Sequence, residues 1–116
     1  MTAFTDFVTE LLEGFGPVRI RRMFGGAGVY AGEVMFAAIF DDALYLKADD
    51  ALRAELAALG SAPFVYQSPR GPMEMSYWRL PETALDDPDE AAAWARKALA
   101  VATAKAAANP KKRRGA

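Results

Sequence analysis

Hydrophobic residues near the start of the chain recur at the three- and four-residue spacing of an amphipathic helix. Thr5 is a suitable N-cap, and Gly14 followed by Gly16-Pro17 is a typical helix end. The pattern therefore predicts a first helix over residues 5–14. Its apolar positions are Phe4, Phe7, Val8, Leu11, Leu12 and Phe15.

Residues 18–47 instead show the two-residue alternation and the short β-branched or aromatic runs of strands. In the first strand, Val18, Ile20, Arg22 and Phe24 share one face, and Arg19, Arg21 and Met23 share the other. Further runs follow at 29–30, 34–40 and 44–47, separated by glycine- or aspartate-containing turns. These runs predict three to four antiparallel strands in a meander.

The second half of the chain predicts two more helices around two strands. A helix is expected from the Asp49-Asp50 cap to Gly60, with Leu52, Leu56 and Leu59 on one side. Strands at 64–66 and 73–80 follow, joined by a loop, "QSPRGP". Asp87, Pro88 and Glu90 mark the start of a last helix that continues to residue 108.

Together these elements predict an α+β fold in the order α-β-β-β-α-β-β-α. We expect a two-layer sandwich, in which an antiparallel sheet of about five strands carries its helices on one face. Residues 1–108 would form a single domain, and residues 109–116 a disordered basic tail.

Composition narrows the chemistry that this domain can perform. The chain has no His and no Cys, so it lacks the commonest general base, the thiolate nucleophile and the usual transition-metal ligands. Asp41-Asp42, Asp49-Asp50 and Asp86-Asp87 lie at expected turns and caps, where Asp has a local hydrogen-bonding role. We therefore expect no enzyme activity, no cofactor and no metal.

Charge is divided unevenly along the chain. Residues 1–109 carry ten Lys or Arg against fifteen Asp or Glu, a net charge of −5. The final "PKKRRGA" adds four positive charges and brings the total to −1. An acidic body is not typical of a domain whose main surface binds nucleic acid. The N-terminus lacks the positive region of a signal peptide, and the expected location is the cytoplasm.

The glycines of "RRMFGGAGVYAGEVMFAAI" admit two interpretations. Gly26-Ala27-Gly28 with Ala31 fits the spacing of a dinucleotide-binding loop, which requires a strand, a loop and then a helix. Val29-Tyr30-Ala31-Gly32 is a poor helix start, so the favoured interpretation is structural. The glycines would then mark a bulge or bent strand that a backbone or an aromatic ring approaches closely.

The same stretch, with "LYLKAD" and "MSYWRLP" followed by "LDD" and a Trp-bearing helix, resembles the N-terminal domain of TfoX/Sxy proteins over residues 5–105. The R-x-M-F-G-G-x-G and aromatic-aromatic-x-L-P segments are its most specific parts. The resemblance implies a two-layer α/β fold like that of secretion chaperones, and no catalytic residues. It also implies a role in regulating competence for DNA uptake with the cyclic-AMP receptor protein. Longer members carry a C-terminal helical domain, where this sequence has its basic tail.

Candidate contact residues are few, and each has a structural alternative. Arg19 and Arg21 could contact phosphates or an acidic partner, or could simply be solvated. Arg22 falls in the apolar register and could pair with an acid or bond carbonyls near the glycines. Arg70 could be a loop contact point or part of a plain turn. Tyr77 is the aromatic expected to be exposed, opposite Trp78 on its strand; Trp78 and Trp94 are expected in the core.

We therefore expect a non-enzymatic regulatory or adaptor domain that acts through protein–protein contacts, with a homodimer left open. The candidates for partner binding are Arg21, Arg22, Arg70 and Tyr77. The alternative is weak nucleic-acid binding through Arg19, Lys111, Lys112, Arg113 and Arg114. The sequence does not identify the partner or the regulated pathway.

Overall fold

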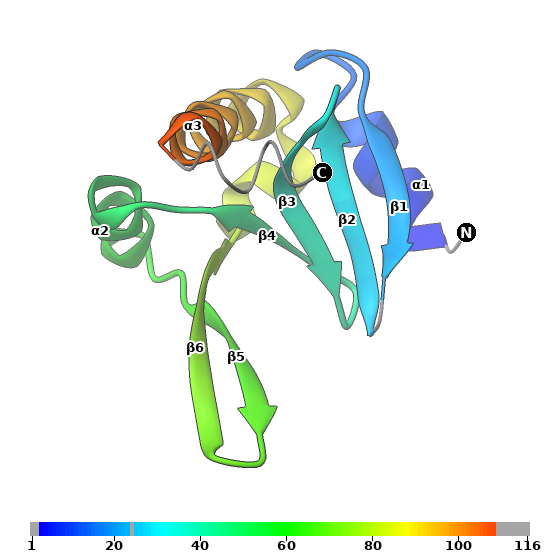
Figure 1. The fold of residues 1–116 in the computed structure, drawn as a ribbon. Helices are drawn as coiled ribbons and strands as arrows, with labels where there is room; N and C mark the ends of the chain where they lie inside the picture. The colour runs from blue at the N-terminus through cyan, green and yellow to red at the C-terminus, as the bar shows by residue number, and fades with distance from the viewer. Residues whose placement is uncertain (1–2, 24, 109–116) are drawn as a thin grey trace.

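A computed structural model describes residues 3–23 and 25–108, which form one six-stranded antiparallel sheet with three α-helices on one of its faces (Figure 1). This arrangement confirms the predicted α+β class. The sheet has six strands rather than about five, because every short run between the turns of the first meander forms its own strand. The elements are α1 (Ala3–Leu11), β1 (Arg19–Met23), β2 (Gly26–Ala31), β3 (Val34–Phe40), β4 (Ala43–Lys47), α2 (Asp50–Ala58), β5 (Pro63–Ser68), β6 (Gly71–Arg79), the 3-10 turn η1 (Glu82–Asp86) and α3 (Pro88–Ala107).

The strands lie in the order β1-β2-β3-β4-β6-β5, so β1 and β5 are the two edges of the sheet. A bulge interrupts the pairing of β2 with β3: Val29 pairs with Ala37, whereas Tyr30 pairs with Met35. Phe36 is the extra residue, and it is fully buried against the ring of Phe15 at a centroid distance of 5.0 Å. The bulge thus adds a large side chain to the core where the alternation would not place one.

The glycine segment is a strand, as the structural interpretation predicts. Gly26 and Gly28 lie within β2, which leads by a tight turn into β3 and not into a helix. A Cβ atom on Gly26 would lie 2.1 Å from the carbonyl oxygen of Ile39 and 2.7 Å from the ring of Phe40. The glycines therefore permit close approach between neighbouring strands.

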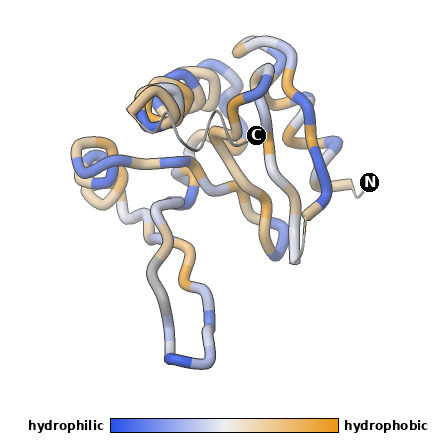
Figure 2. The backbone as a smooth tube through the Cα atoms, viewed as in Figure 1, coloured by the Kyte–Doolittle hydropathy of each residue, from blue (hydrophilic) through white to orange (hydrophobic). Residues whose placement is uncertain are grey.

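The helices cover the face of the sheet that carries its larger aliphatic side chains. Helix α3 packs along β3 and β4, α2 lies against β6, and α1 contacts α3. Figure 2 shows β3 as hydrophobic over most of its length and the edge strand β1 as more hydrophilic. The largest fully buried side chains are Phe36, Leu12, Leu46, Leu56, Val8 and Val29.

Two of the three predicted N-cap residues accept the expected hydrogen bond at the start of their helix. The side chain of Asp49 accepts a hydrogen bond from the amide of Leu52 at 2.8 Å, and that of Asp87 accepts one from the amide of Glu90 at 3.2 Å. The predicted Thr5 cap is wrong. Thr5 lies inside α1 and is buried, because it belongs to the face that packs on the sheet.

Two smaller predictions also need correction, and a third lies outside the described residues. Leu59 does not complete the buried side of α2, since it is the C-cap residue and 58% exposed. The segment "QSPRGP" is not a loop throughout, because β5 runs to Ser68 and β6 starts at Gly71. The resulting β5–β6 hairpin projects away from the body of the sheet (Figure 1). Residues 109–116, the predicted tail, lie outside the described residues.

Candidate partner-binding surface

The face of the sheet opposite the helices carries a second set of aromatic and cationic side chains. The pairing register separates the two faces: Ile20, Val29, Ala37, Leu46 and Trp78 lie on the helix side, and the side chains next to them along each strand point the other way. We call this second side the open face. It is formed by Arg19, Arg21, Tyr30, Met35, Phe40, Tyr45, Lys47, Phe64, Tyr77 and Arg79.

Three aromatic rings, from β3, β4 and β5, form a cluster on the open face. Phe40 stacks on Phe64 at a centroid distance of 4.3 Å and an interplanar angle of 14°. Tyr45 meets Phe64 edge-on at 5.4 Å and lies 6.3 Å from Phe40. All three side chains are only partly buried. The stack joins β3 to β5, which is three places away in the sheet, so the sheet curves around this cluster.

Two arginines of β1 lie on the same face, beside Tyr30 of β2. The guanidinium carbons of Arg19 and Arg21 lie 5.6 Å and 5.8 Å from the ring centroid of Tyr30. This distance is within the range of cation–π attraction. Gly28 lies beneath Tyr30 and Met35, and a Cβ there would come within 3.0 Å of both side chains. The glycine therefore lets the ring and the thioether lie close to the strand.

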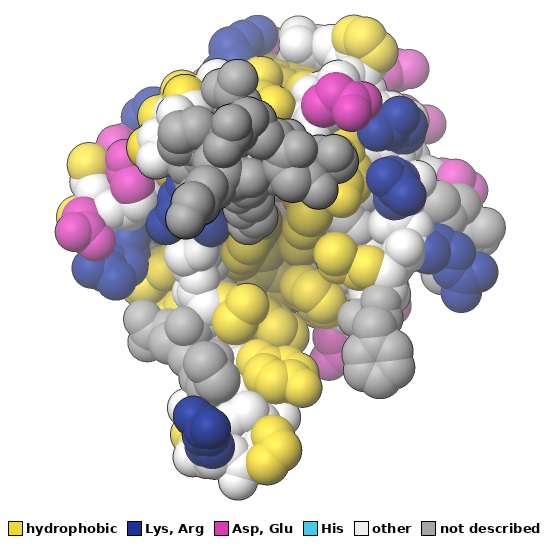
Figure 3. All heavy atoms as spheres, in the orientation of Figure 1, with side chains coloured by type: hydrophobic (Ala, Val, Ile, Leu, Met, Phe, Trp, Pro, Cys, Tyr) yellow, Lys and Arg dark blue, Asp and Glu magenta, His cyan; other side chains and the backbone are white. Residues whose placement is uncertain are grey.

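The open face is positively charged although the body as a whole is acidic. Arg19, Arg21, Lys47 and Arg79 all belong to it. No strand residue whose side chain the structure describes is Asp or Glu. The carboxylates whose side chains the structure describes lie in the helices, their caps and the turns. Figure 3 shows hydrophobic side chains in the hollow between the β5–β6 hairpin and β1, with Lys and Arg side chains along its margins.

Tyr77 lies on the open face, as predicted, but is half-buried rather than exposed. The ammonium of Lys47 lies 5.1 Å from its ring centroid and donates a hydrogen bond to the hydroxyl of Ser76 at 2.6 Å. Burial raises the pKa of the Tyr77 hydroxyl above its usual value, and Tyr30 adds a smaller effect in the same direction. Tyr77 therefore stays neutral where an exposed tyrosine begins to ionise.

This pKa shift predicts a loss of stability at high pH. The charged form of Tyr77 is disfavoured in the folded protein, so above about pH 10, the usual tyrosine pKa, the unfolded chain loses this proton first. The free energy of unfolding should then fall as pH rises. We expect the free energy of unfolding, measured by urea denaturation, to fall less steeply between pH 9 and 11 in Tyr77→Phe than in the wild type. The same slope in both proteins would contradict the assignment to Tyr77.

Arg22 lies on the helix side of β1, in the predicted register, but its side chain is exposed. It lines an open hollow of about 510 Å³ together with Thr5, Asp41 and Asp42. Within the part of the chain that the structure describes, no ion pair joins Arg22 to either aspartate. The predicted acid pairing of Arg22 is thus not observed, and Arg22 is separated from the open face.

The remaining predicted contact residues are dispersed. Arg70 lies in the turn at the tip of the β5–β6 hairpin, where Ser68 accepts its backbone amide hydrogen bond at 3.2 Å. Lys111, Lys112, Arg113 and Arg114 lie outside the described residues. The structure thus brings Arg19, Arg21 and Tyr77 to one face, and it places Arg22 and Arg70 elsewhere.

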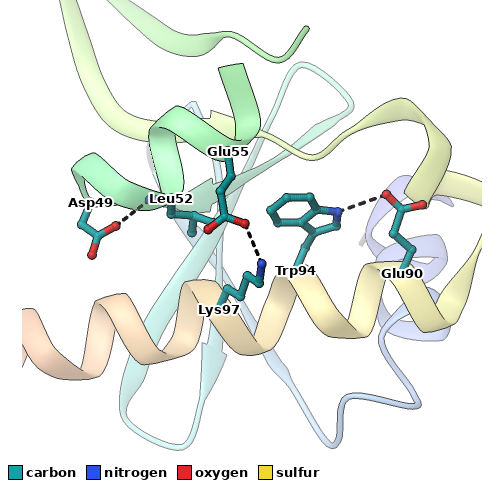
Figure 4. Close-up of polar contacts among 6 residues, drawn as sticks. All are labelled: Asp49, Leu52, Glu55, Glu90, Trp94 and Lys97. Atoms are coloured by element: carbon teal, nitrogen blue, oxygen red, sulfur yellow. Dashed lines mark hydrogen bonds and ion pairs between the residues drawn. The ribbon is translucent and has the colours of Figure 1, made fainter. Parts of the chain in front are cut away.

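Polar contacts on the opposite side of the molecule hold the helix layer together (Figure 4). Lys97 of α3 donates to the carboxylate of Glu55 in α2 at 2.6 Å. The indole of Trp94 donates to Glu90 at 3.1 Å, so this tryptophan is anchored within the helix layer. The first contact joins α2 to α3, and the second orients the indole of Trp94 along α3.

The structure adds two further observations on the kinds of site present. Within residues 3–23 and 25–108, no group of three or more Asp or Glu side chains comes together in a way that could hold a metal ion. None of the helices in that part of the chain combines the length and the apolar character that crossing a membrane requires.

Comparison with known proteins identifies the family. No curated protein matches the chain. The sequence model of the TfoX N-terminal domain matches residues 10–102 of the 116 residues. The match spans the sheet from β1 to β6 and most of α3, and so includes the whole open face. This result confirms the resemblance seen in the sequence, and the chain belongs to the TfoX N-terminal domain family.

Proposed function

We propose that this protein is a non-enzymatic regulatory or adaptor domain that binds a protein partner through the open face. The observation that carries the proposal is the partly exposed cluster of Phe40, Tyr45 and Phe64, on the side of the sheet that the helices leave uncovered. Contiguous apolar surface rimmed by polar groups is typical of interaction sites. Aromatic and Arg side chains, which this face combines, are the residues that most often dominate binding energy at interfaces.

Two further arguments support a binding role over catalysis. The chain has neither His nor Cys, so its inventory of nucleophiles and general bases is poor. The glycines that resemble a cofactor loop serve strand packing in β2. We place the protein in the cytoplasm, in keeping with this role.

Family membership supports the regulatory part of the proposal. The resemblance to TfoX/Sxy proteins implies control of competence genes, and we propose that the domain contributes to such transcriptional regulation by contacting another protein. The alternative is weak nucleic-acid binding. The placement of Arg19 and Arg21 beside Tyr30 favours this alternative, whereas the net charge of −1 argues against it.

Site-specific photo-crosslinking in cells tests the proposal. A photoreactive phenylalanine would replace Tyr30 or Phe64 on the open face, and Leu59 or Phe7 on the helix side as controls; both control residues are exposed. We expect discrete, protease-sensitive adducts from the open-face positions only. Loss of competence-gene transcripts on Phe64→Ala, with normal protein levels, would support the regulatory part.

Two results would contradict the proposal. Adducts that appear equally at the control positions would show that the open face is not the contact site. Adducts that resist protease but disappear with nuclease would favour the nucleic-acid alternative.

A further inference from the structure

We propose that the outer edge of β1 accepts one additional strand from the partner protein, with acidic side chains opposite the arginines of β1. The inference rests on the proposed function, because a strand added there would extend the open face on its β1 side. It goes further by specifying the contact, which is backbone pairing along an edge of the sheet with carboxylates at fixed positions.

The outer side of β1 is an accessible edge of the sheet (Figure 1). β1 pairs with β2, and within the part of the chain that the structure describes no strand lies on its other side. Four of its five residues are exposed, and none is Pro. Every second residue of an antiparallel edge strand directs its backbone N–H and C=O away from its neighbour. These are the groups to which an extended peptide binds when it adds a strand to a sheet.

The side chains of β1 place positive charge on both faces of the sheet. Arg19 and Arg21 lie on the open face, and Arg22 lies on the helix side. The strand contains no Asp or Glu. A strand that paired with this edge would therefore meet arginines on both of its faces. The charge of the incoming strand then decides whether it is accepted, because an edge of this kind disfavours uncharged and basic strands.

The guanidiniums of β1 have hydrogen-bond donors left for a partner. Arg19 donates a long hydrogen bond to the carbonyl of Gly32 at 3.4 Å and has an ion pair with Glu33 at 3.9 Å. The Glu33 side chain is 95% exposed, and such a pair contributes little. Within the described residues, Arg21 and Arg22 make no ion pair. Because a guanidinium carries several N–H donors, all three side chains can bind a carboxylate.

Cross-strand pairing determines the order of residues in the added strand. Residues directly opposite one another share a face, with Cβ atoms about 4.5–5.5 Å apart, and opposite charges there attract. We expect antiparallel pairing, as between all the neighbouring strands of this sheet. From its N-terminus, the added strand would place two consecutive acidic residues opposite Arg22 and Arg21. An apolar residue opposite Ile20 and a third acidic residue opposite Arg19 would follow.

The three arginine positions are not equivalent. Arg22 lines a hollow together with Asp41 and Asp42, although neither aspartate forms an ion pair with it. A partner's carboxylate at this position would meet like charges as well as the guanidinium. We therefore expect Arg19 and Arg21 to contribute more to binding than Arg22.

Charge argues against a second copy of the chain as the added strand. Antiparallel pairing of β1 with itself about its centre would place Arg21 opposite the partner's Arg21. Like charges directly opposite each other are destabilising. The other edge strand, β5, has no charged residue and so lacks the feature that selects an acidic strand. A nucleic acid could neutralise the arginines, but it could not pair with the backbone of the edge.

Fluorescence anisotropy with the full chain tests this inference. The probe is a labelled nine-residue peptide with Glu-Glu-Val-Glu at its centre and Thr and Val on either side, and its twin carries Gln in place of Glu. A fifteen-residue oligothymidylate serves as the nucleic-acid probe. We expect the acidic peptide to bind in the micromolar range or more weakly, because the interface is small. The Gln twin should bind about tenfold more weakly still, because its cross-strand charge pairs are lost.

Two N-methylated forms of the acidic peptide test the backbone pairing. One carries N-methyl groups at the odd positions of the central segment, and the other at the even positions. An N-methyl group removes a hydrogen-bond donor, and only one of the two sets of donors would point toward β1. We expect one form to retain its affinity within about threefold and the other to lose about tenfold or more.

Matched protein variants locate the binding site. Arg19→Gln with Arg21→Gln should weaken the acidic peptide about fivefold or more and leave the Gln twin within about twofold, since the lost attraction is to the carboxylates. Arg22→Gln should weaken the acidic peptide less than this pair does. Arg70→Gln with Lys105→Gln removes the same charge from two exposed positions outside β1 and should change affinity less than about twofold. Circular dichroism checks that each variant is folded.

The outcomes separate this inference from the proposed function. Equal affinity of the acidic peptide and its Gln twin, or an equal loss from the control pair, would overturn the acidic strand. Equal affinity of the two N-methylated forms would overturn the backbone pairing. If the open-face crosslinks persisted in any of these cases, the proposed function would stand. Tighter binding of the oligothymidylate than of the acidic peptide, weakened by the arginine pair, would overturn both in favour of nucleic acid.

Discussion

Replacing Gly26 by alanine is expected to lower the free energy of unfolding by about 3 kcal/mol, the upper end of the usual cost of over-packing. The new Cβ would lie 2.1 Å from the carbonyl oxygen of Ile39, which is backbone and cannot rotate away. Relief requires β2 and β3 to separate where Gly26 pairs with Phe40. Because β3 contributes side chains both to the core and to the aromatic cluster, a shift of β3 would disturb the packing on both faces of the sheet. Urea denaturation followed by tryptophan fluorescence measures the change.

Two other glycines provide graded controls for this prediction. A Cβ on Gly28 would meet the thioether of Met35 and the ring of Tyr30 at 3.0 Å, and these side chains can move, so Gly28→Ala should cost less. Gly14 has no neighbouring atom within 4 Å of its Cβ position, and Gly14→Ala should change stability by less than about 0.5 kcal/mol. Equal effects at Gly26 and Gly14 would contradict the close strand approach.

Local sequence patterns predicted the elements well because local chemistry determines them. Asp87 followed by Pro88 marks the start of α3 through a capping bond and a fixed φ, both of which depend on neighbouring residues only. The alternation around Arg21 and Ile20 likewise assigns the two faces of β1 without knowledge of the rest of the fold. The Thr5 cap was wrong because Thr5 lies within α1, on its buried face.

The candidate site was harder to predict because it depends on non-local pairing. Arg19, Arg21 and Tyr77 were identified singly, but Phe40, Tyr45 and Phe64 were missed. Tyr45 carried a signal, since it alternates with Leu44 and Leu46, whereas the apolar run 34–40 and its bulge at Phe36 conceal the face on which Phe40 lies. The stack of Phe40 on Phe64 joins residues 24 positions apart and depends on the curvature of the sheet, which no local pattern encodes. The net charge of the whole chain was misleading as well, because it sums the cations of the open face with the carboxylates of the helices, caps and turns.

Phe36→Ala is expected to cost about 3–5 kcal/mol, a large part of the total stability of a domain of this size. The ring of Phe36 is fully buried and packs on Phe15 at 5.0 Å, so its removal would leave a cavity between the sheet and the segment that follows α1. Thermal and urea denaturation measure the loss. If the alanine variant does not fold, Phe36→Leu retains most of the volume and should give a smaller, measurable loss.

Phe40 lies on the same strand four residues away and is the matched control. It belongs to the open face and is only partly buried, so Phe40→Ala should cost about 1–2 kcal/mol, mainly from the lost stack on Phe64. Phe40→Ala should also weaken binding of the partner to the open face, whereas Phe36→Leu should leave this binding unchanged. An equal stability loss at the two positions would mean that both faces of β3 are core. A large difference, with the binding defect confined to Phe40, would show that β3 stabilises the fold on one face and presents the partner site on the other.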